Sequence, residues 1–193
     1  MTPEIQEIVR DLDGHRAKFE AFCRSLSEEE LDREVPNSHW LVRDFIAHLA
    51  TIDGPVRVMF ESMTGEQPAR TSTPDTSSGE RWDVDRWNDS RVAARRTKTV
   101  DEIFAEAAHE RAHMHGALAN LSEADLDKTM HFGGDNKRSA ADIRLGDYIR
   151  GWAKHDVIHA ADMLRALPER KTPDVEAWLD DPAVTGYQRM MNR

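Results

Sequence analysis

The stretch from Arg150 to Leu164 constrains the fold most, because its apolar residues recur every three or four positions, the period of an α-helix. With the residues on either side, the stripe reads Leu145, Tyr148, Trp152, His155, His159, Met163 and Ala166. The separation of four places the imidazoles of His155 and His159 one turn apart, near enough to share a metal ion. Buried imidazoles need polar partners, since an unpaired buried polar group costs roughly 1–3 kcal/mol. The stripe therefore predicts either a metal site or two core histidines satisfied by backbone or carboxylate groups.

Composition favours a single helical domain and argues against several classes of protein. The chain has 193 residues, enough for one domain with a core, and a formal charge of −10. That charge argues against a nucleic-acid partner, and the basic cluster Arg91, Arg95 and Arg96 is interpreted as a solvated helix face. The single cysteine, Cys23, is predicted to be a small core residue. With no signal peptide and no apolar run of about 20 residues, we expect a cytoplasmic protein without a membrane partner.

Four long helical segments are expected. They run from about Pro3 to Ser25, from Ser38–Trp40 to about Met63, from Thr99 to about Asn120, and from the end of a loop at Met130–Asp142 to about Leu167. Pro55 predicts a kink in the second segment, because it removes a backbone donor. The stretch between Gly65 and Gly79 is rich in Pro, Ser, Thr and Gly and is predicted to be a long crossover loop. One long crossover among four helices predicts an all-α four-helix bundle.

The chain is expected to divide into a bundle, residues 1–167, and a C-terminal tail, residues 168–193. Pro173, Pro182 and Gly186 break the tail into short pieces. Trp178 and Leu179 are its expected anchors, packing on the bundle or on a partner subunit.

A short acidic sequence occurs twice, once in Leu26–Arg33 and again in Leu121–Lys128. Each copy has a serine followed three residues later by an acidic residue, the pattern of a capping box at a helix start. The repetition predicts two similar helical hairpins, each with a histidine-bearing second helix. His48 would come from one hairpin, and His155 and His159 from the other.

These three histidines are the candidate metal ligands. Three neutral imidazoles leave a coordination position open, as in catalytic rather than structural sites. A divalent ion there would lower the pKa of a bound water or thiol, which is therefore the expected reactive group, with no catalytic side chain assigned. The ligand set fits Zn, Ni, Fe or Mn.

Two further residues are candidates for the surroundings of the site. Asp44 lies one turn before His48, where it either accepts a hydrogen bond from that histidine or is a solvated surface carboxylate. Trp152 lies one turn before His155 and is expected to line the cavity.

A second histidine pair, His109 and His113, repeats the separation of four on the third helical segment, with His115 close by. Because the residues sharing their face are more polar, these are interpreted as surface histidines.

Two motifs resemble the DinB-like superfamily: Trp40-Leu-Val-Arg-Asp-Phe-Ile-Ala-His48-Leu-Ala, and His155-Asp-x-x-His159-Ala-x-x-Leu/Met. The segment from Arg86 to Arg96 also resembles that group. That superfamily includes the YfiT-like metal hydrolases, the bacillithiol transferases and the N-terminal domain of mycothiol-dependent maleylpyruvate isomerase. The resemblance covers about residues 5–167. It implies a four-helix bundle of up-up-down-down connectivity, often dimeric, with His48, His155 and His159 as metal ligands. Since mycothiol-dependent members often have a carboxylate where His155 stands, this sequence is more similar to the all-histidine members.

The first functional hypothesis is a metal-dependent enzyme acting on a small molecule, either a thiol S-transferase with a low-molecular-weight thiol cosubstrate or a hydrolase. The alternative is a non-catalytic protein of the same fold that binds or sequesters a small molecule, as resistance and stress-response proteins do. A third hypothesis, in which a metal only stabilises the fold, ranks last because the helices can form a core without it.

Overall fold

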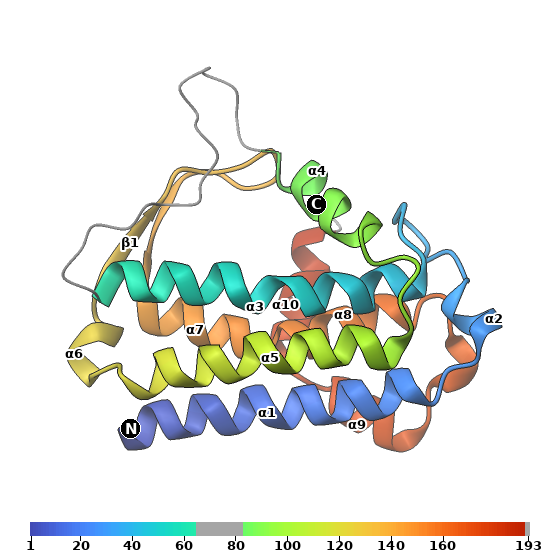
Figure 1. Cartoon of the computed structure of the whole chain (residues 1–193), viewed down its shortest axis with the longest axis horizontal. Helices are drawn as coiled ribbons and strands as arrows, with labels where there is room; N and C mark the ends of the chain where they lie inside the picture. Colours follow the sequence, from blue (N-terminus) through green and yellow to red (C-terminus); the bar gives the residue numbers. More distant parts are fainter. Residues whose placement is uncertain (65–82, 192–193) are drawn as a thin grey trace.

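The computed structural model describes residues 1–64 and 83–191, and the expected four-helix bundle is confirmed (Figure 1). Its long helices are α1 (Pro3–Arg24), α3 (Val42–Thr64), α5 (Val100–Ala119) and the consecutive pair α7 (Leu145–Ala153) and α8 (His155–Met163). Helix α3 continues through Pro55. The expected crossover loop after Gly65 lies outside the described residues. No helix in the described ranges is long and apolar enough to cross a membrane.

The helix directions differ from the expected up-up-down-down order. Helices α1 and α7–α8 run one way and α3 and α5 the other, so the order along the chain is up, down, down, up (Figure 1). Contacts from Phe45 to His159 and from Asp53 to Trp152 fix α3 antiparallel to α7–α8. Of the connections between the long helices, the one between α3 and α5 is the longest, and these two helices run parallel.

The predicted capping boxes are confirmed. Ser27 and Ser122 begin the short helices α2 (Glu28–Leu31) and α6 (Glu123–Leu126), and Thr99 begins α5. Each side chain accepts a hydrogen bond from the third residue of its helix, and that residue's carboxylate accepts one from the cap's own N–H. The repeated acidic sequence therefore forms the same local structure at both positions.

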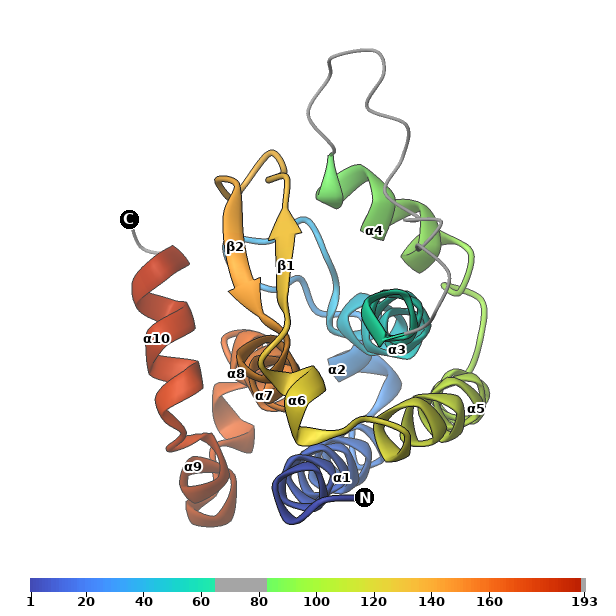
Figure 2. The same ribbon diagram turned by 90° about the vertical axis from the view of Figure 1, so that its left-hand side faces the viewer.

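The prediction that Met130–Asp142 is only a loop was wrong. Strands β1 (Thr129–Phe132) and β2 (Ala141–Arg144) form an antiparallel hairpin. Polar and apolar residues do alternate in both strands, but each strand has only four residues and none of them is fully buried, so the signal in the sequence is short and weak. In Figure 2 the hairpin stands out from the bundle between α10 (Pro182–Met191) and α4 (Val84–Ala93). Its tip supports the start of α4, because the Asn136 side chain accepts the Val84 N–H.

The C-terminal residues form short helices against the bundle: η2 (Pro168–Arg170), α9 (Pro173–Leu179) and α10. Helices α9 and α10 pack against α8. The expected anchors Trp178 and Leu179 both contact the apolar core, and the Trp178 indole N–H donates to His15 Nδ1 at 3.0 Å. The tail thus meets the helix that carries two of the candidate ligands.

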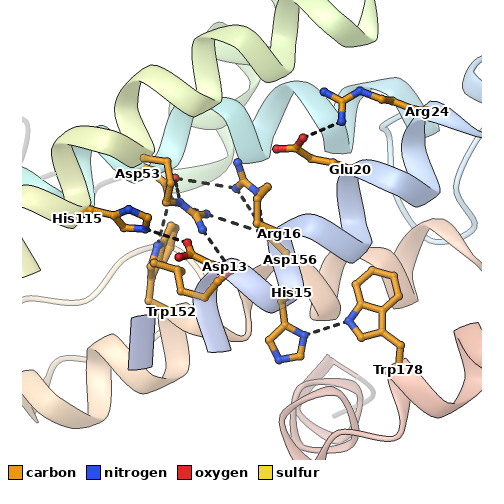
Figure 3. Close-up of polar contacts among 12 residues, drawn as sticks. Asp13, His15, Arg16, Glu20, Arg24, Asp53, His115, Trp152, Asp156 and Trp178 are labelled. Atoms are coloured by element: carbon orange, nitrogen blue, oxygen red, sulfur yellow. Dashed lines mark hydrogen bonds and ion pairs between the residues drawn. The ribbon is translucent and has the colours of Figure 1, made fainter. Parts of the chain in front are cut away.

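A layer of buried charge divides the bundle core into two apolar halves. Arg16 from α1, Asp53 from α3, Arg111 from α5 and Asp156 from α8 all lie between the two halves. Figure 3 shows Arg16, Asp53 and Asp156 together. Cys23 belongs to the apolar half next to the histidines, as predicted, and burial raises the pKa of its thiol. Cys23 is therefore not suited to act as a nucleophile.

Each charge in this layer has a partner on another helix. Arg16 donates two hydrogen bonds to Asp156, at 2.7 and 3.1 Å, and Arg111 Nε donates to Asp53 at 2.6 Å. Although burial alone would raise the pKa of Asp156, the guanidinium groups of Arg16 and Arg111 hold it below its ordinary value. Two arginines and two aspartates make the layer neutral, and removing one member would leave a buried charge unpaired.

Candidate metal centre

The three candidate histidines lie together at the interface of α3 and α8. One ring nitrogen from each of His48, His155 and His159 lies within 4.8 Å of the other two. Helix α8 begins at His155, after a break at Lys154, and the separation of four brings His159 directly above it. His48 faces the pair from the opposing helix α3. The three ligands predicted from the sequence are therefore neighbours in space.

The distances within the cluster are those of groups able to share one ion. The Nε2 atoms of His155 and His159 are 3.1 Å apart, and their rings meet edge to face at 4.5 Å between centroids. The His48 ring centroid lies 5.3 Å from that of His155 and 5.1 Å from that of His159. Zn–N bonds of about 2.0–2.1 Å would span the 3.1 Å separation without large movement.

Burial keeps two of these imidazoles in the neutral form that binds metal ions. Desolvation lowers the pKa of His48 well below its ordinary value, and a charge on His159 would lower it further. The pKa of His155 is lowered in the same way, first by burial and then by the neighbouring His159 and His48. A neutral imidazole offers a lone pair to an ion without first losing a proton.

The hydrogen bonds of the cluster leave room for a ligand. His159 Nδ1 lies 3.1 Å from Asp162 Oδ2, which can orient that ring. The Nδ1 atoms of His48 and His155 are buried and have no hydrogen-bond partner among the described residues. Three close imidazole nitrogens, two of them on rings without another polar partner, fit a divalent metal better than the alternative of satisfied core histidines.

Aromatic side chains surround the three imidazoles. The Trp152 indole stacks on His155 at 4.3 Å and 21°, consistent with its expected place beside the site. Trp40 lies 5.2 Å from His48, and Phe45 lies 5.5 Å from His159. Apart from Trp152, these neighbours were not predicted. They exclude water from the cluster on several sides.

Helix α10 also reaches the site, which the sequence did not indicate. The ring of Tyr187 lies 6.3 Å from that of His159. Burial, followed by the charge of Asp162, raises the pKa of Tyr187 to about 12. The phenol therefore stays protonated at neutral pH and can donate a hydrogen bond beside the cluster.

Asp44 has neither of the two roles considered for it. Its carboxylate is fully buried and accepts two hydrogen bonds from Arg96, both at 3.0 Å. Asp44 Oδ2 also accepts the Leu41 N–H at 3.1 Å at the start of α3. Because this ion pair joins the first turn of α3 to the residues just after α4, Asp44 holds these two segments together instead of orienting His48.

The second histidine pair, His109 and His113, lies on another helix than the clustered histidines. His109 and His113 are exposed on α5, as predicted. The basic cluster is only partly the expected solvated face. Arg95 pairs with Glu106, and Arg91 donates to the Thr51 carbonyl. Arg91 and Arg95 line a groove of about 510 Å³ between α3, α4 and α5, apart from the three clustered histidines.

Comparison with known proteins agrees with this fold. The family model of the DinB superfamily matches residues 5–163. Two crystal structures of mycothiol-dependent maleylpyruvate isomerase, one of them a mutant, are similar to the chain. The mutant has a TM-score of 0.60 at 14% identity and the other 0.59 at 15%, each match covering 84% of this chain and 63% of that one. The chain thus spans 63% of the length of these neighbours, and identity this low shows the fold alone. Comparison with curated proteins gave no match.

Proposed function

The chain belongs to the DinB superfamily, and from its three clustered histidines we propose that it is a metal-dependent enzyme that activates a thiol or a water molecule for reaction with a small-molecule substrate. The observation that carries the proposal is the meeting of three imidazole nitrogens within 4.8 Å, in a setting where two of the rings have lowered pKa values. His48, His155 and His159 would hold the ion.

When bound at such a site, a divalent transition metal lowers the pKa of a thiol or water ligand toward neutrality and acts as a Lewis acid. The chain's own residues provide the setting for this chemistry. Asp162 orients His159, while Trp40, Phe45 and Trp152 exclude water around the rings. The Tyr187 hydroxyl, protonated at neutral pH, can donate a hydrogen bond to a substrate oxygen near His159.

Within this proposal, S-transfer with a low-molecular-weight thiol is the first version and hydrolysis the second. The thiol version is supported by the fold neighbours, whose names describe a mycothiol-dependent enzyme. The candidate metals are Zn, Ni, Fe and Mn, and imidazole ligands favour the first three over Mn. The homodimer that the resemblance implies is a separate proposal, to be checked by sedimentation.

The test is metal content, measured by elemental analysis on untagged protein. We compare the wild type with His155→Ala/His159→Ala and with a matched control, His109→Ala/His113→Ala. The control removes two histidines at the same spacing from the surface of α5. We expect about one transition-metal ion per chain in the wild type and control, and none in the first variant.

Turnover then separates the two functional classes. An enzyme should convert a thiol and an electrophile, or hydrolyse an ester or amide, over many cycles, and it should lose this activity in His48→Ala. A sequestering protein should instead saturate at a fixed stoichiometry. Absence of metal from all three proteins, even after Zn or Ni is added, would overturn the proposal.

A further inference from the structure

The three imidazoles of the cluster are held in place by different kinds of contact. A metal-bound histidine usually donates its second ring N–H to a carboxylate or carbonyl, and this bond sets the angle of the ring. His159 has such a partner in Asp162, at 3.1 Å. His48 and His155 have no partner for Nδ1 among the described residues. Some other contact must therefore set the angles of these two rings.

For His155 that contact is Trp152, whose indole stacks almost parallel on the imidazole, 4.3 Å away and inclined by 21°. The indole is itself held from behind, because Trp152 Nε1 donates to Asp53 Oδ1 at 3.2 Å. Asp53 is 1% exposed and is fixed by Arg111 in the buried charge layer. Through Trp152, the charge layer therefore reaches a candidate ligand.

For His48 the corresponding contact is Trp40, with ring centroids 5.2 Å apart and the rings inclined by 44°, so the indole packs at a tilt and does not stack. Trp40 Nε1 donates to Asp89 Oδ1 on α4 at 2.7 Å. His39 Nε2 lies 2.7 Å from the same oxygen. Although burial opposes ionisation, these two hydrogen bonds hold the pKa of Asp89 below its ordinary value, so the acceptor is an anion at neutral pH.

We propose that Asp53 and Asp89 are positioning residues, which hold the imidazoles of His155 and His48 in place through the indoles of Trp152 and Trp40. Both histidines without a polar partner on Nδ1 have this arrangement of indole and aspartate, whereas His159 contacts its aspartate directly. A ring contact alone, stacked or tilted, leaves an indole free to move in its own plane, and a charge-assisted hydrogen bond at Nε1 removes that freedom. The inference rests on the proposed metal site.

The experiment uses substitutions that remove the hydrogen bond of one indole, and Asp89→Ala also removes the contact with the exposed His39. Asp89→Ala removes the acceptor at a side chain that is 43% exposed, and Asp89→Asn restores an acceptor without the charge. Trp152→Phe keeps an aromatic ring on His155 but removes the N–H, and it leaves the pairing of Asp53 with Arg111 intact. Two controls match them. Asp85→Ala removes an aspartate of α4 that pairs with Lys137, and Trp178→Phe removes a buried indole N–H that donates to His15 on α1.

Two measurements are made on each protein. One is the nitrogen NMR signals of the histidine rings in metal-free protein, which broaden or split when a ring loses a fixed orientation. The other is the dissociation constant for Co²⁺, whose visible absorption also reports coordination geometry. We expect Asp89→Ala to disturb the His48 signals and Trp152→Phe those of His155. Each should weaken Co²⁺ binding about tenfold to a hundredfold, while Asp89→Asn recovers most of the loss and the controls match wild type.

The outcomes separate the two proposals. If the wild type binds no Co²⁺ but the ring signals are disturbed in Asp89→Ala and Trp152→Phe, the metal site is wrong and the positioning roles are supported. Co²⁺ binding by the wild type, with ring signals and affinity unchanged in Asp89→Ala and Trp152→Phe, would overturn the positioning roles and keep the metal site. A fall in melting temperature without either change would show that these residues serve stability only.

Discussion

The protein carries two histidine pairs that are nearly identical as local structures, His155/His159 on α8 and His109/His113 on α5. The Nε2 atoms are 3.1 Å apart in the first pair and 3.2 Å in the second. The ring centroids are separated by 4.5 and 4.7 Å, with interplanar angles of 82° and 79°. A separation of four residues on a helix is enough to produce this geometry.

The two pairs differ in the side chains and solvent that surround them. The α8 pair meets His48 from the opposing helix and lies among Trp152, Phe45 and Tyr187. The α5 pair faces solvent, and no third ligand lies near it in the described part of the chain. Helix geometry alone therefore brings two candidate ligands together, whereas tertiary packing is needed to add the third candidate ligand and to bury the imidazoles in a low-dielectric environment.

The largest expected effect concerns the charge layer under the α8 pair. Asp156→Ala should lower the free energy of unfolding by about 3–5 kcal/mol, because it leaves the buried Arg16 without its two strong hydrogen bonds. Asp13→Ala removes the partner of His115 beside the α5 pair, where the carboxylate is 48% exposed, and should cost less than about 1 kcal/mol. Urea unfolding of the metal-free proteins measures both. Equal losses of unfolding free energy in the two variants would mean that the carboxylates beside the two histidine pairs contribute equally to stability.

A smaller effect is expected when the buried pair is made to resemble the exposed one. His48→Ala leaves α8 with two ligands, the number on α5, so affinity for Zn²⁺ should fall by more than about a hundredfold, or roughly 2.7 kcal/mol. Competition with a chelator of known affinity measures the change, and His113→Ala is the matched control. If the His48→Ala protein keeps wild-type affinity, the third ligand has been assigned wrongly.

Much of the fold could be predicted because local rules determine it. Thr99 and Ser122 begin helices through their own side chains, and the spacing of His155 and His159 fixes their shared face. The hairpin β1–β2 escaped prediction because its strands have only four residues each, so their alternation of polar and apolar residues is too short to distinguish a strand from a loop. The order of helix directions was expected from the resemblance and not from the residues, and the observed order differs from it.

The charge layer escaped prediction although the sequence contained a signal for it. Arg16 follows Leu12 by four residues and precedes Phe19 by three, so it stands inside the apolar stripe of its helix. Arg111 stands in the same way between Ala107 and Met114 on α5. A charged residue at a core position needs a buried partner, but the sequence does not show which of the other helices provides it. The positions of Asp89 and Tyr187 beside the histidines depend in the same way on how α4 and α10 pack.

The smallest expected effect is the response of the metal-free protein to pH, which separates the buried histidines from exposed ones. In the folded protein the pKa values of His48 and His155 lie well below the ordinary 6.5, mainly because burial disfavours the charged ring. The unfolded chain takes up protons at these positions below about pH 6.5, while the folded protein does not. Stability is therefore full above pH 6.5 and is lost as pH falls, by up to about 1.4 kcal/mol per pH unit for each histidine. Urea unfolding at pH 7.5, 6.5 and 5.5, in a His109→Gln/His113→Gln background without the exposed pair, should show this slope. Adding His155→Gln should make it shallower by up to half, and an unchanged slope would mean that His155 is not held neutral by burial.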